Sequence, residues 1–205
     1  MKRLFDLSGA VGGLLFFSPV MGLVALAILL EDGRPLFFTQ PRLGEQRRPF
    51  TILKFRSMRN GCVTRVGRVL RATGLDELPQ FVNVLRGDMS AVGPRPLAEA
   101  DVVRLGWSAP RYDFRWRVPP GLTGLAQIMG PGGSRRSLLL DRFYIARRSM
   151  WLDVRLVALS FAINALGKTR TRELLSKMQP RRHEDTKNQI VLLRVFVLSW
   201  LRFWR

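Results

Sequence analysis

The chain has 205 residues, of which 34 are Lys or Arg and 15 are Asp or Glu, so its formal net charge is +19 at pH 7. So large a basic excess favours an anionic partner, either nucleic acid or a membrane surface. Hydrophobic residues form 47% of the chain, which excludes intrinsic disorder as its main state. One cysteine, Cys62, and one histidine, His183, exclude a disulfide framework within the chain and a two-histidine metal motif. Any catalysis must rest mainly on carboxylates, Lys, Arg or hydroxyl groups.

An uncharged apolar segment of 24 residues runs from Leu7 to Leu30. As a helix it would be roughly 36 Å long, enough to cross a ~30 Å hydrocarbon core. It exceeds the apolar part of a signal peptide, which is roughly 7–15 residues. Because basic residues flank the segment on both sides, both flanks favour the cytoplasmic face of a membrane.

Ser18 and Pro19 lie near the centre of this segment. Proline removes a backbone donor and kinks a helix, and the Ser18 hydroxyl can bond back to an upstream carbonyl. The two arms, Leu4 to Phe17 and Val20 to Leu30, are each too short to cross a bilayer, but together they could dip in and return. Since proline is also tolerated in membrane-spanning helices, the residues leave two topologies open: a kinked span and a re-entrant hairpin.

A region rich in turns follows and is predicted to contain both strands and helices. Two short strands are predicted at Pro35–Gln40 and Pro49–Phe55, with a polar turn at Pro41–Gly44 between them. Apolar residues recur at helical spacing in Asp76–Arg86, and Gly87 supplies a helix stop. The other predicted elements are helices at Gly67–Arg71 and Leu138–Leu166 and a turn followed by an extended run at Val118–Met129.

Positive charge is concentrated in two blocks. Arg42 to Arg71 contains nine Lys or Arg and one acid, which fits a solvated face, a nucleic-acid contact, a membrane-surface footprint or a polyphosphate site. The segment 167–205 contains ten basic and three acidic residues. Within it, the apolar stretch 190–204 carries arginines and tryptophans, a pattern typical of a helix in the membrane interface, although a core helix or a strand is the alternative.

Asp76 and Glu77 are the strongest catalytic candidates. An ionised aspartate can attack phosphorus and form an aspartyl-phosphate intermediate, and a neighbouring carboxylate can hold Mg²⁺. A structural alternative also fits these residues, because Thr73 and Asp76 have the spacing of a helix capping box.

Basic residues near this pair could bind phosphate. Arginine and lysine side chains would neutralise a diphosphate and the charge that develops during phosphoryl transfer, although any one of them could equally be a surface cation. The backbone around Arg95 is fixed by Pro94 and Pro96, and Asp88 follows a glycine and could be a turn or cap residue. The candidates for substrate binding are Lys54, Arg56, Arg71, Asp88 and Arg95.

Several long strings resemble those of the bacterial sugar transferases known as monotopic phosphoglycosyl transferases. They are FFTQPRLGEQRRPFTILKFRSM, LDELPQFVNVLRGDMSAVGPRPL and PGLTGLAQIMG. The string KRLFDLSGAVGGLLFFSPVMGL is similar to that family's re-entrant membrane helix with its central Ser-Pro break. The resemblance runs in the same order from Lys2 to about Leu166.

The resemblance implies transfer of a phosphosugar from a nucleoside diphosphate sugar, usually a UDP-sugar, to polyprenol phosphate, with release of UMP. It implies a covalent phosphosugar on Asp76, a Mg²⁺ ion held by Asp76 and Glu77, and an active-site region that includes Lys54, Arg56 and Arg95. The expected location is the cytoplasmic face of the bacterial inner membrane, in the first membrane step of a polysaccharide or glycoconjugate pathway.

The expected fold is α-rich α+β, with a re-entrant membrane hairpin joined to a small cytoplasmic catalytic domain that has interfacial amphipathic helices. The predicted parts are a hairpin at 1–32, a catalytic domain at 33–166 and a basic extension at 167–205 with an interfacial helix at 190–204. The expected partners are the nucleotide sugar, polyprenol phosphate and an anionic membrane surface, and nucleic acid is not expected. A membrane-tethered nucleic-acid-binding protein or a non-catalytic complex subunit is the alternative.

Overall fold

A computed structural model describes residues 1–130 and 133–166. The chain divides into two units, Met1–Arg172 and Glu173–Arg205, and all described residues belong to the first unit. The predicted extension 167–205 and its helix at 190–204 lie outside the described residues.

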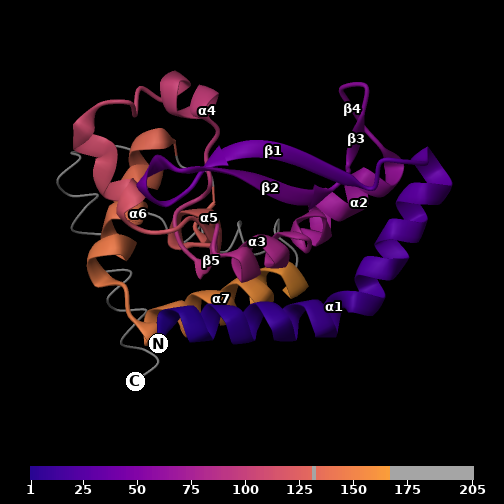
Figure 1. Ribbon diagram of the computed structural model, residues 1–205, viewed down its shortest axis with the longest axis horizontal. Helices are drawn as coiled ribbons and strands as arrows, with labels where there is room; N and C mark the ends of the chain where they lie inside the picture. The colour runs from indigo at the N-terminus through magenta and orange to yellow at the C-terminus, as the bar shows by residue number, and fades with distance from the viewer. Residues whose placement is uncertain (131–132, 167–205) are drawn as a thin grey trace. The chain divides into compact units, whose positions relative to one another are not determined.

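The described part is rich in helices and carries three small two-stranded sheets, which agrees with the predicted α-rich α+β class (Figure 1). The α-helices are α1 Lys2–Asp32, α2 Arg65–Thr73, α3 Gln80–Arg86, α4 Glu99–Arg104, α5 Leu125–Ile128, α6 Ser134–Arg147 and α7 Met150–Leu166. The 3₁₀ helices are η1 Glu45–Arg47, η2 Leu75–Glu77 and η3 Pro110–Arg117. The strands are β1 Phe37–Leu43, β2 Pro49–Phe55, β3 Met58–Arg59, β4 Cys62–Val63, β5 Ser90–Val92 and β6 Gly121–Thr123.

Helix α1 is continuous but bent, and Pro19 lies inside it (Figure 1). The Ser18 hydroxyl donates a hydrogen bond of 2.8 Å to the carbonyl of Leu15, as predicted. The two predicted arms therefore form one helix with a bend rather than two helices separated by a gap. The missing amide donor of proline and the back-bonded serine together explain the change of direction.

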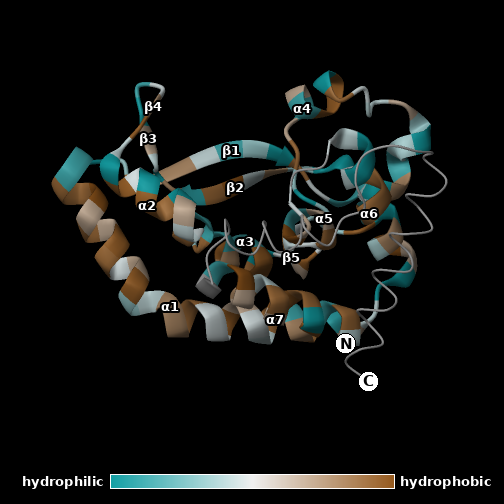
Figure 2. Cartoon of the chain, turned by 180° about the vertical axis from the view of Figure 1, so that it is seen from behind, coloured by the Kyte–Doolittle hydropathy of each residue, from teal (hydrophilic) through white to brown (hydrophobic). Residues whose placement is uncertain are grey.

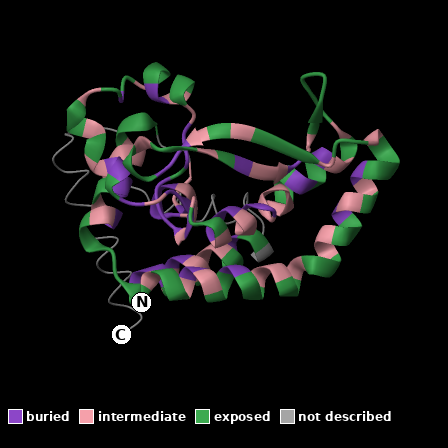
Figure 3. Ribbon diagram, viewed as in Figure 1, coloured by how far each residue is buried: buried purple, intermediate pink, exposed green. Residues whose placement is uncertain are grey.

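The apolar surface of α1 is largely exposed. Within residues 1–130 and 133–166, α1 is the one helix long and apolar enough to cross a membrane, and only 11% of its most apolar window is buried. Figure 2 shows hydrophobic residues along both of its arms, and Figure 3 shows exposed residues along its outer side. Such a helix fits insertion into a membrane, either spanning it or embedded in it. The most exposed large side chains are Leu4, Leu15, Phe16, Leu23 and Leu30.

Strands β1 and β2 form an antiparallel hairpin, as the sequence predicted. The predicted turn at Pro41–Gly44 is wrong, because Pro41 and Arg42 pair with Thr51 and Phe50 inside the sheet. Proline lacks an amide donor, but β1 has a strand neighbour on one side only, so this position tolerates it. The connection is instead the segment 44–48, where the amide of Gly44 donates to the carbonyl of Arg48 at 2.8 Å.

The predicted helix Asp76–Arg86 is divided in two. Its first residues form η2, and α3 begins only after the buried Pro79. Gly87 ends α3 in the left-handed conformation with φ of 94°, which confirms the predicted stop. The capping-box alternative is wrong, because the Thr73 hydroxyl donates to the carbonyls of Val69 and Leu70 within α2.

The predicted helix Leu138–Leu166 is likewise two helices, α6 and α7. Ser149 separates them, and its hydroxyl accepts a hydrogen bond of 3.2 Å from the amide of Leu152 in the first turn of α7. A serine in this position satisfies a free amide at the start of a helix and favours a new helix over the continuation of the old one. The apolar periodicity on both sides concealed this boundary.

Both arms of α1 pack against the rest of the unit. On the first arm, Ala10 belongs to a buried cluster with Ile52 of β2 and Val84 of α3. On the second arm, Val24 and Ile28 belong to a cluster with Phe55 and Leu70. A third cluster, formed by Leu43, Leu97, Val102, Trp107 and Trp116, lies under α4 and η3. The first two clusters therefore fix α1 against β2, α2 and α3, and α2 and α3 flank η2 with its Asp76–Glu77 pair in the sequence.

A methyl group added at Gly13 tests the contact between α1 and α3. It would lie 2.7 Å from Cζ of Phe81, whereas a methyl group at the adjacent Gly12 has no neighbour within 4 Å. We expect Gly13→Ala to lower the free energy of unfolding by about 1–3 kcal/mol relative to Gly12→Ala, because the ring must move out of a packed site. Thermal unfolding in detergent measures the difference, and equal midpoints for the two variants would show that α3 does not pack there.

Candidate functional site

The N-terminal end of α1 is bound to the domain by charged side chains. Lys2 Nζ lies 2.5 Å from Oδ2 of Asp153, a carboxylate that is buried in α7. Arg3 donates to the last carbonyls of α3, at Val84 (2.6 Å) and Leu85 (2.7 Å). Cations at a helix C-terminus also suit the helix dipole.

Two further polar groups complete this attachment. Asp6 Oδ1 accepts hydrogen bonds of 3.0 Å from the Ser90 hydroxyl and the Ala91 amide of β5. The hydroxyl of Tyr144 lies 2.8 Å from Oδ1 of Asp153, and burial together with the charge of that carboxylate raises the pKa of the Tyr144 hydroxyl. Tyr144 therefore stays protonated and available as a donor to the carboxylate.

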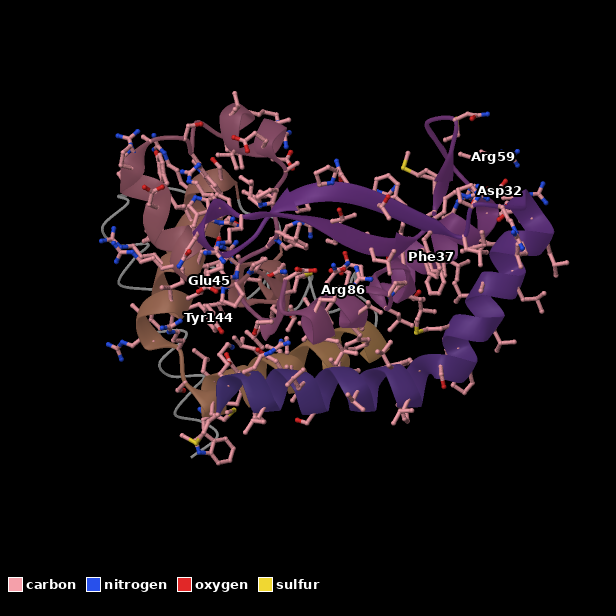
Figure 4. The ribbon with its side chains drawn as sticks, in the orientation of Figure 1. Asp32, Phe37, Glu45, Arg59, Arg86 and Tyr144 are labelled. Atoms are coloured by element: carbon pink, nitrogen blue, oxygen red, sulfur yellow. The ribbon has the colours of Figure 1, made fainter. Side chains whose placement is uncertain are left out.

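The C-terminal end of α1 is bound to the same unit. Both carboxylate oxygens of Glu31 accept hydrogen bonds of 2.8 Å from the first amides of α2, at Arg65 and Val66. Asp32 forms ion pairs with Arg56 (3.6 Å) and Arg59 (3.4 Å), and Figure 4 shows Arg59 and Asp32 side by side at the end of the helix. An apolar helix is thus held at both ends by charged contacts to one domain.

Asp76 and Glu77 lie in η2, which follows a left-handed turn at Gly74 with φ of 80°. Lys54 of β2 reaches across, and its Nζ lies 2.6 Å from Oε1 of Glu77. Both side chains are partly exposed, at 19% for Lys54 and 35% for Glu77. The structure therefore joins one predicted cation directly to the predicted acidic pair.

Helix α3 begins three residues after Glu77 and packs on α1. The rings of Phe81 and Phe17 are stacked with centroids 6.4 Å apart. Phe17 precedes the Ser18-Pro19 bend, so the start of α3, a few residues after the acidic pair, packs against α1 next to the point where α1 changes direction.

The remaining predicted site residues have other surroundings. Arg56 donates to the Gly33 carbonyl at 2.9 Å, in addition to its ion pair, and its side chain is only 11% exposed. Arg71 is exposed in the last turn of α2, and Arg95 is exposed in the loop after β5. Lys54 thus binds Glu77, whereas Arg56 binds the C-terminal end of α1.

Asp88 takes part in a buried network around Asn83, a residue that the sequence analysis did not identify. The Asn83 amide nitrogen donates to the Thr51 carbonyl (2.8 Å) and to Oδ2 of Asp88 (3.2 Å), and its oxygen accepts from the Leu53 amide (3.0 Å). Asn83 is fully buried. It therefore fixes β2, and with it Lys54, relative to α3. The helical spacing gave no signal for Asn83, because the residue does not lie on the apolar stripe of Leu78, Phe81, Val82 and Leu85.

The predicted magnesium site at Asp76 and Glu77 stays a prediction. Across residues 1–130 and 133–166 there is no cluster of three or more His, Cys, Asp or Glu side chains that could hold a metal ion. Mg²⁺ is commonly bound by one or two carboxylates together with substrate phosphates and water, and in such a site Asp76 and Glu77 would supply the protein ligands.

Residues 1–166 match the family described as bacterial sugar transferase. The undecaprenyl-phosphate glucose phosphotransferase of Komagataeibacter xylinus is 42% identical over 184 residues, which cover 78% of this chain and 35% of that protein. The UDP-N-acetylgalactosamine-undecaprenyl-phosphate N-acetylgalactosaminephosphotransferase of Aeromonas hydrophila is 40% identical over 77% of this chain and 42% of that protein. The exopolysaccharide production protein PSS of Rhizobium leguminosarum is 35% identical over 77% of this chain and 91% of that protein. This chain spans less than half of the length of the first two. The predicted resemblance is confirmed over the matched residues.

Removal of the Asn83 amide tests whether this residue holds β2 and α3 together. We expect Asn83→Ala to lower the free energy of unfolding by about 2–4 kcal/mol, because it removes the partner of the Thr51 carbonyl and of the Leu53 amide, two partly buried groups of β2. The matched variant Asp88→Ala removes only the hydrogen bond between Asn83 and Asp88 and should lower the free energy of unfolding by about 1 kcal/mol or less. Thermal or denaturant unfolding compares the two, and a loss of equal size would contradict the assigned role of Asn83.

Proposed function

Because this chain belongs to the bacterial sugar transferase family, we propose that it transfers a phosphosugar from a nucleoside diphosphate sugar to polyprenol phosphate. The main observation behind this proposal is the Asp76–Glu77 pair. Lys54 binds Glu77, and the α3 helix that follows the pair packs against α1, a bent helix with an exposed apolar surface. A lipid phosphate lies at headgroup depth, whereas a nucleotide sugar is soluble. A site next to a membrane-inserted helix is open to both. The printed names of relatives make UDP-glucose and UDP-N-acetylgalactosamine the first donors to test.

The proposed reaction has two steps. A carboxylate oxygen of Asp76 attacks the phosphorus that carries the sugar, the bond from that phosphorus to the bridging oxygen breaks, and UMP leaves. A phosphate oxygen of the polyprenol phosphate then attacks the same phosphorus, which releases the Asp76 carboxylate and forms a lipid diphosphate sugar. Neither step needs a histidine, because the nucleophiles of both steps are already anionic.

Lys54 and Glu77 have supporting parts in this proposal. The Lys54 ammonium places positive charge beside η2, where it attracts the donor diphosphate and fixes Glu77. Asp76 and Glu77 would hold Mg²⁺, which would neutralise charge on the diphosphate when bound. Arg71 and Arg95, both exposed, are available for further phosphate or nucleotide contacts.

A re-entrant placement of α1 is part of the proposal. The two ends of a membrane-spanning helix lie on opposite sides of a hydrocarbon core of about 30 Å. Here Lys2 at one end pairs with Asp153, and Asp32 at the other end pairs with Arg56, within one compact unit. A membrane crossing would break one of these attachments. The basic flanks favour the cytoplasmic face of the inner membrane.

Conversion of Asp76 to asparagine tests the mechanism. Purified protein in detergent or nanodiscs is given UDP-glucose or UDP-N-acetylgalactosamine, polyprenol phosphate and Mg²⁺, and released UMP is measured. We expect Asp76→Asn to lower turnover by at least about 10³-fold, because it removes the nucleophile. Glu99→Gln, an exposed change on α4, serves as the control and should retain activity. Intact mass after incubation with donor alone should show one phosphosugar on the wild-type chain, and unchanged activity of Asp76→Asn would exclude this mechanism.

Cysteine labelling tests the placement of α1. In a Cys62→Ser background, one variant carries a cysteine in a short extension before Met1 and a second carries Arg34→Cys. An impermeant maleimide is applied to inverted and to right-side-out vesicles. We expect both positions to react only in inverted vesicles, since both ends of α1 bind one cytoplasmic domain. Reaction from opposite faces would establish a span instead.

A further inference from the structure

The loop that carries Arg95 is fixed by its carbonyl groups. Four consecutive carbonyls each accept a hydrogen bond, and the donors come from three separate segments of the chain. The donors are the Gly121 amide to Pro94 (2.9 Å), Arg115 Nη2 to Arg95 (2.6 Å), Arg42 Nη1 to Pro96 (3.4 Å) and the Leu43 amide to Leu97 (2.8 Å). The loop itself contributes two prolines, which limit its backbone further. The Arg95 side chain is left exposed on a rigid backbone.

Arg115 is the most unusual of these donors because it is a buried cation. Its side chain is 3% exposed, and its Nε lies 2.9 Å from Oδ2 of Asp141, whose side chain is 4% exposed. The guanidinium also lies over the rings of Trp107 and Trp116, at 5.5 and 5.2 Å from their centroids. Burial lowers the pKa of Arg115 and raises the pKa of Asp141, so each charge depends on the other.

The planar fork of Arg115 has two separate partners. Nε binds the Asp141 carboxylate, and Nη2 binds the backbone carbonyl of Arg95. Lysine offers a single ammonium group and cannot reproduce both contacts in one plane. A buried ion pair is seldom the most stable choice for a core, because apolar side chains of the same volume often stabilise it as well or better. The second contact, to the loop, gives this pair a use beyond stability.

A second arginine supports the same loop from β1. Arg42 Nη1 lies 3.1 Å from Oδ2 of Asp101 while it donates to the Pro96 carbonyl. Burial, and to a smaller extent the positive charge of Arg95, lowers the pKa of Arg42 and of Arg115. The Arg95 guanidinium therefore lies close enough to each of the two other arginines to repel it. These two are neutralised by Asp101 and Asp141, whereas Arg95 faces solvent.

We propose that Arg115, held by Asp141, is a positioning residue that fixes the Arg95 guanidinium for the phosphate oxygens of the nucleotide donor. The inference rests on the proposed function, because it assigns Arg95 to the anionic donor. It goes further in naming a buried pair on η3 and α6, outside η2, that sets the affinity for the donor. Arg115 itself does not touch the substrate.

A double-mutant cycle between Arg115 and Arg95 separates positioning from general stability. We expect Arg115→Lys to lower kcat/KM for the nucleotide sugar by about 10- to 100-fold, because a small displacement of a binding group has this effect. In an Arg95→Ala background the same change should lower kcat/KM by less than about twofold, since the positioned group is already gone. Arg117→Lys, an exposed change on the same 3₁₀ helix, is the matched control and should have no effect. Equal losses in both backgrounds would overturn the proposal.

A double variant that lacks both buried charges provides a second test in case a single change prevents folding. The double replacement Arg115→Met with Asp141→Leu removes both buried charges and is expected to keep the unfolding midpoint within a few degrees of wild type. It should nevertheless raise the KM for the donor about tenfold or more, because the Arg95 carbonyl loses its donor. A well-folded double variant with wild-type KM would overturn the positioning role.

Binding of UMP in the presence of Mg²⁺, measured by calorimetry, separates failure of this inference from failure of the proposed function. If the wild-type protein binds UMP but transfers no sugar, the proposed transfer reaction is wrong. The positioning role of Arg115 is then still tested by the UMP affinities of the variants. We expect Arg115→Lys to weaken UMP binding about tenfold with Arg95 present and not at all with Arg95→Ala. Equal affinities of wild type and Arg115→Lys, or the absence of any UMP binding, would overturn it.

Discussion

The charged residues at the two ends of α1 both bind the domain that follows it, and the placement of the candidate site depends on these contacts. The buried carboxylate of Asp153 requires a cation, and Lys2 supplies it at the first residue of the helix. At the other end, Asp32 binds Arg56. Since the residues between these ends are apolar and largely exposed, the helix cannot be stabilised by burial in the domain alone. The charged contacts at its two ends fix the position of α1 on the domain, and its exposed apolar surface favours lipid over water.

The same contacts connect the helix to the chemistry of the site. Arg56 directly follows the last residue of β2, two residues after Lys54, so the same segment of the chain binds both Glu77 and the end of α1. On the other side, Phe81 of α3 packs against Gly13 and Phe17. A change in the position of α1 would therefore reach Glu77 through both β2 and α3. With α1 inserted in a membrane as proposed, this arrangement would couple the depth of the helix to the geometry of the proposed catalytic pair.

Sequence patterns predicted the parts of the molecule that depend on local preference. The bend at Pro19, the stop at Gly87 and the hairpin of β1 and β2 follow from residue types and spacing. The strand residue Pro41 was assigned to a turn, because its tolerance depends on β1 having one strand neighbour, and that is a property of the whole sheet. Asn83 was not identified, since a buried amide is recognised only by the three groups that it binds in other elements. Long-range polar contacts leave no periodic signal in a sequence.

The distribution of charge explains why the roles of individual arginines could not be assigned from a count. In the described part of the chain, acidic side chains such as Asp32, Asp101 and Asp141 form ion pairs with arginines that hold loops and helix ends. Arg115 and Arg95 lie twenty residues apart in one basic protein and are identical in type. Burial makes the first a structural cation that needs its acid, whereas exposure leaves the second available to an anion. The basic excess is thus a sum of two populations, and only the exposed one can bind phosphate or lipid headgroups.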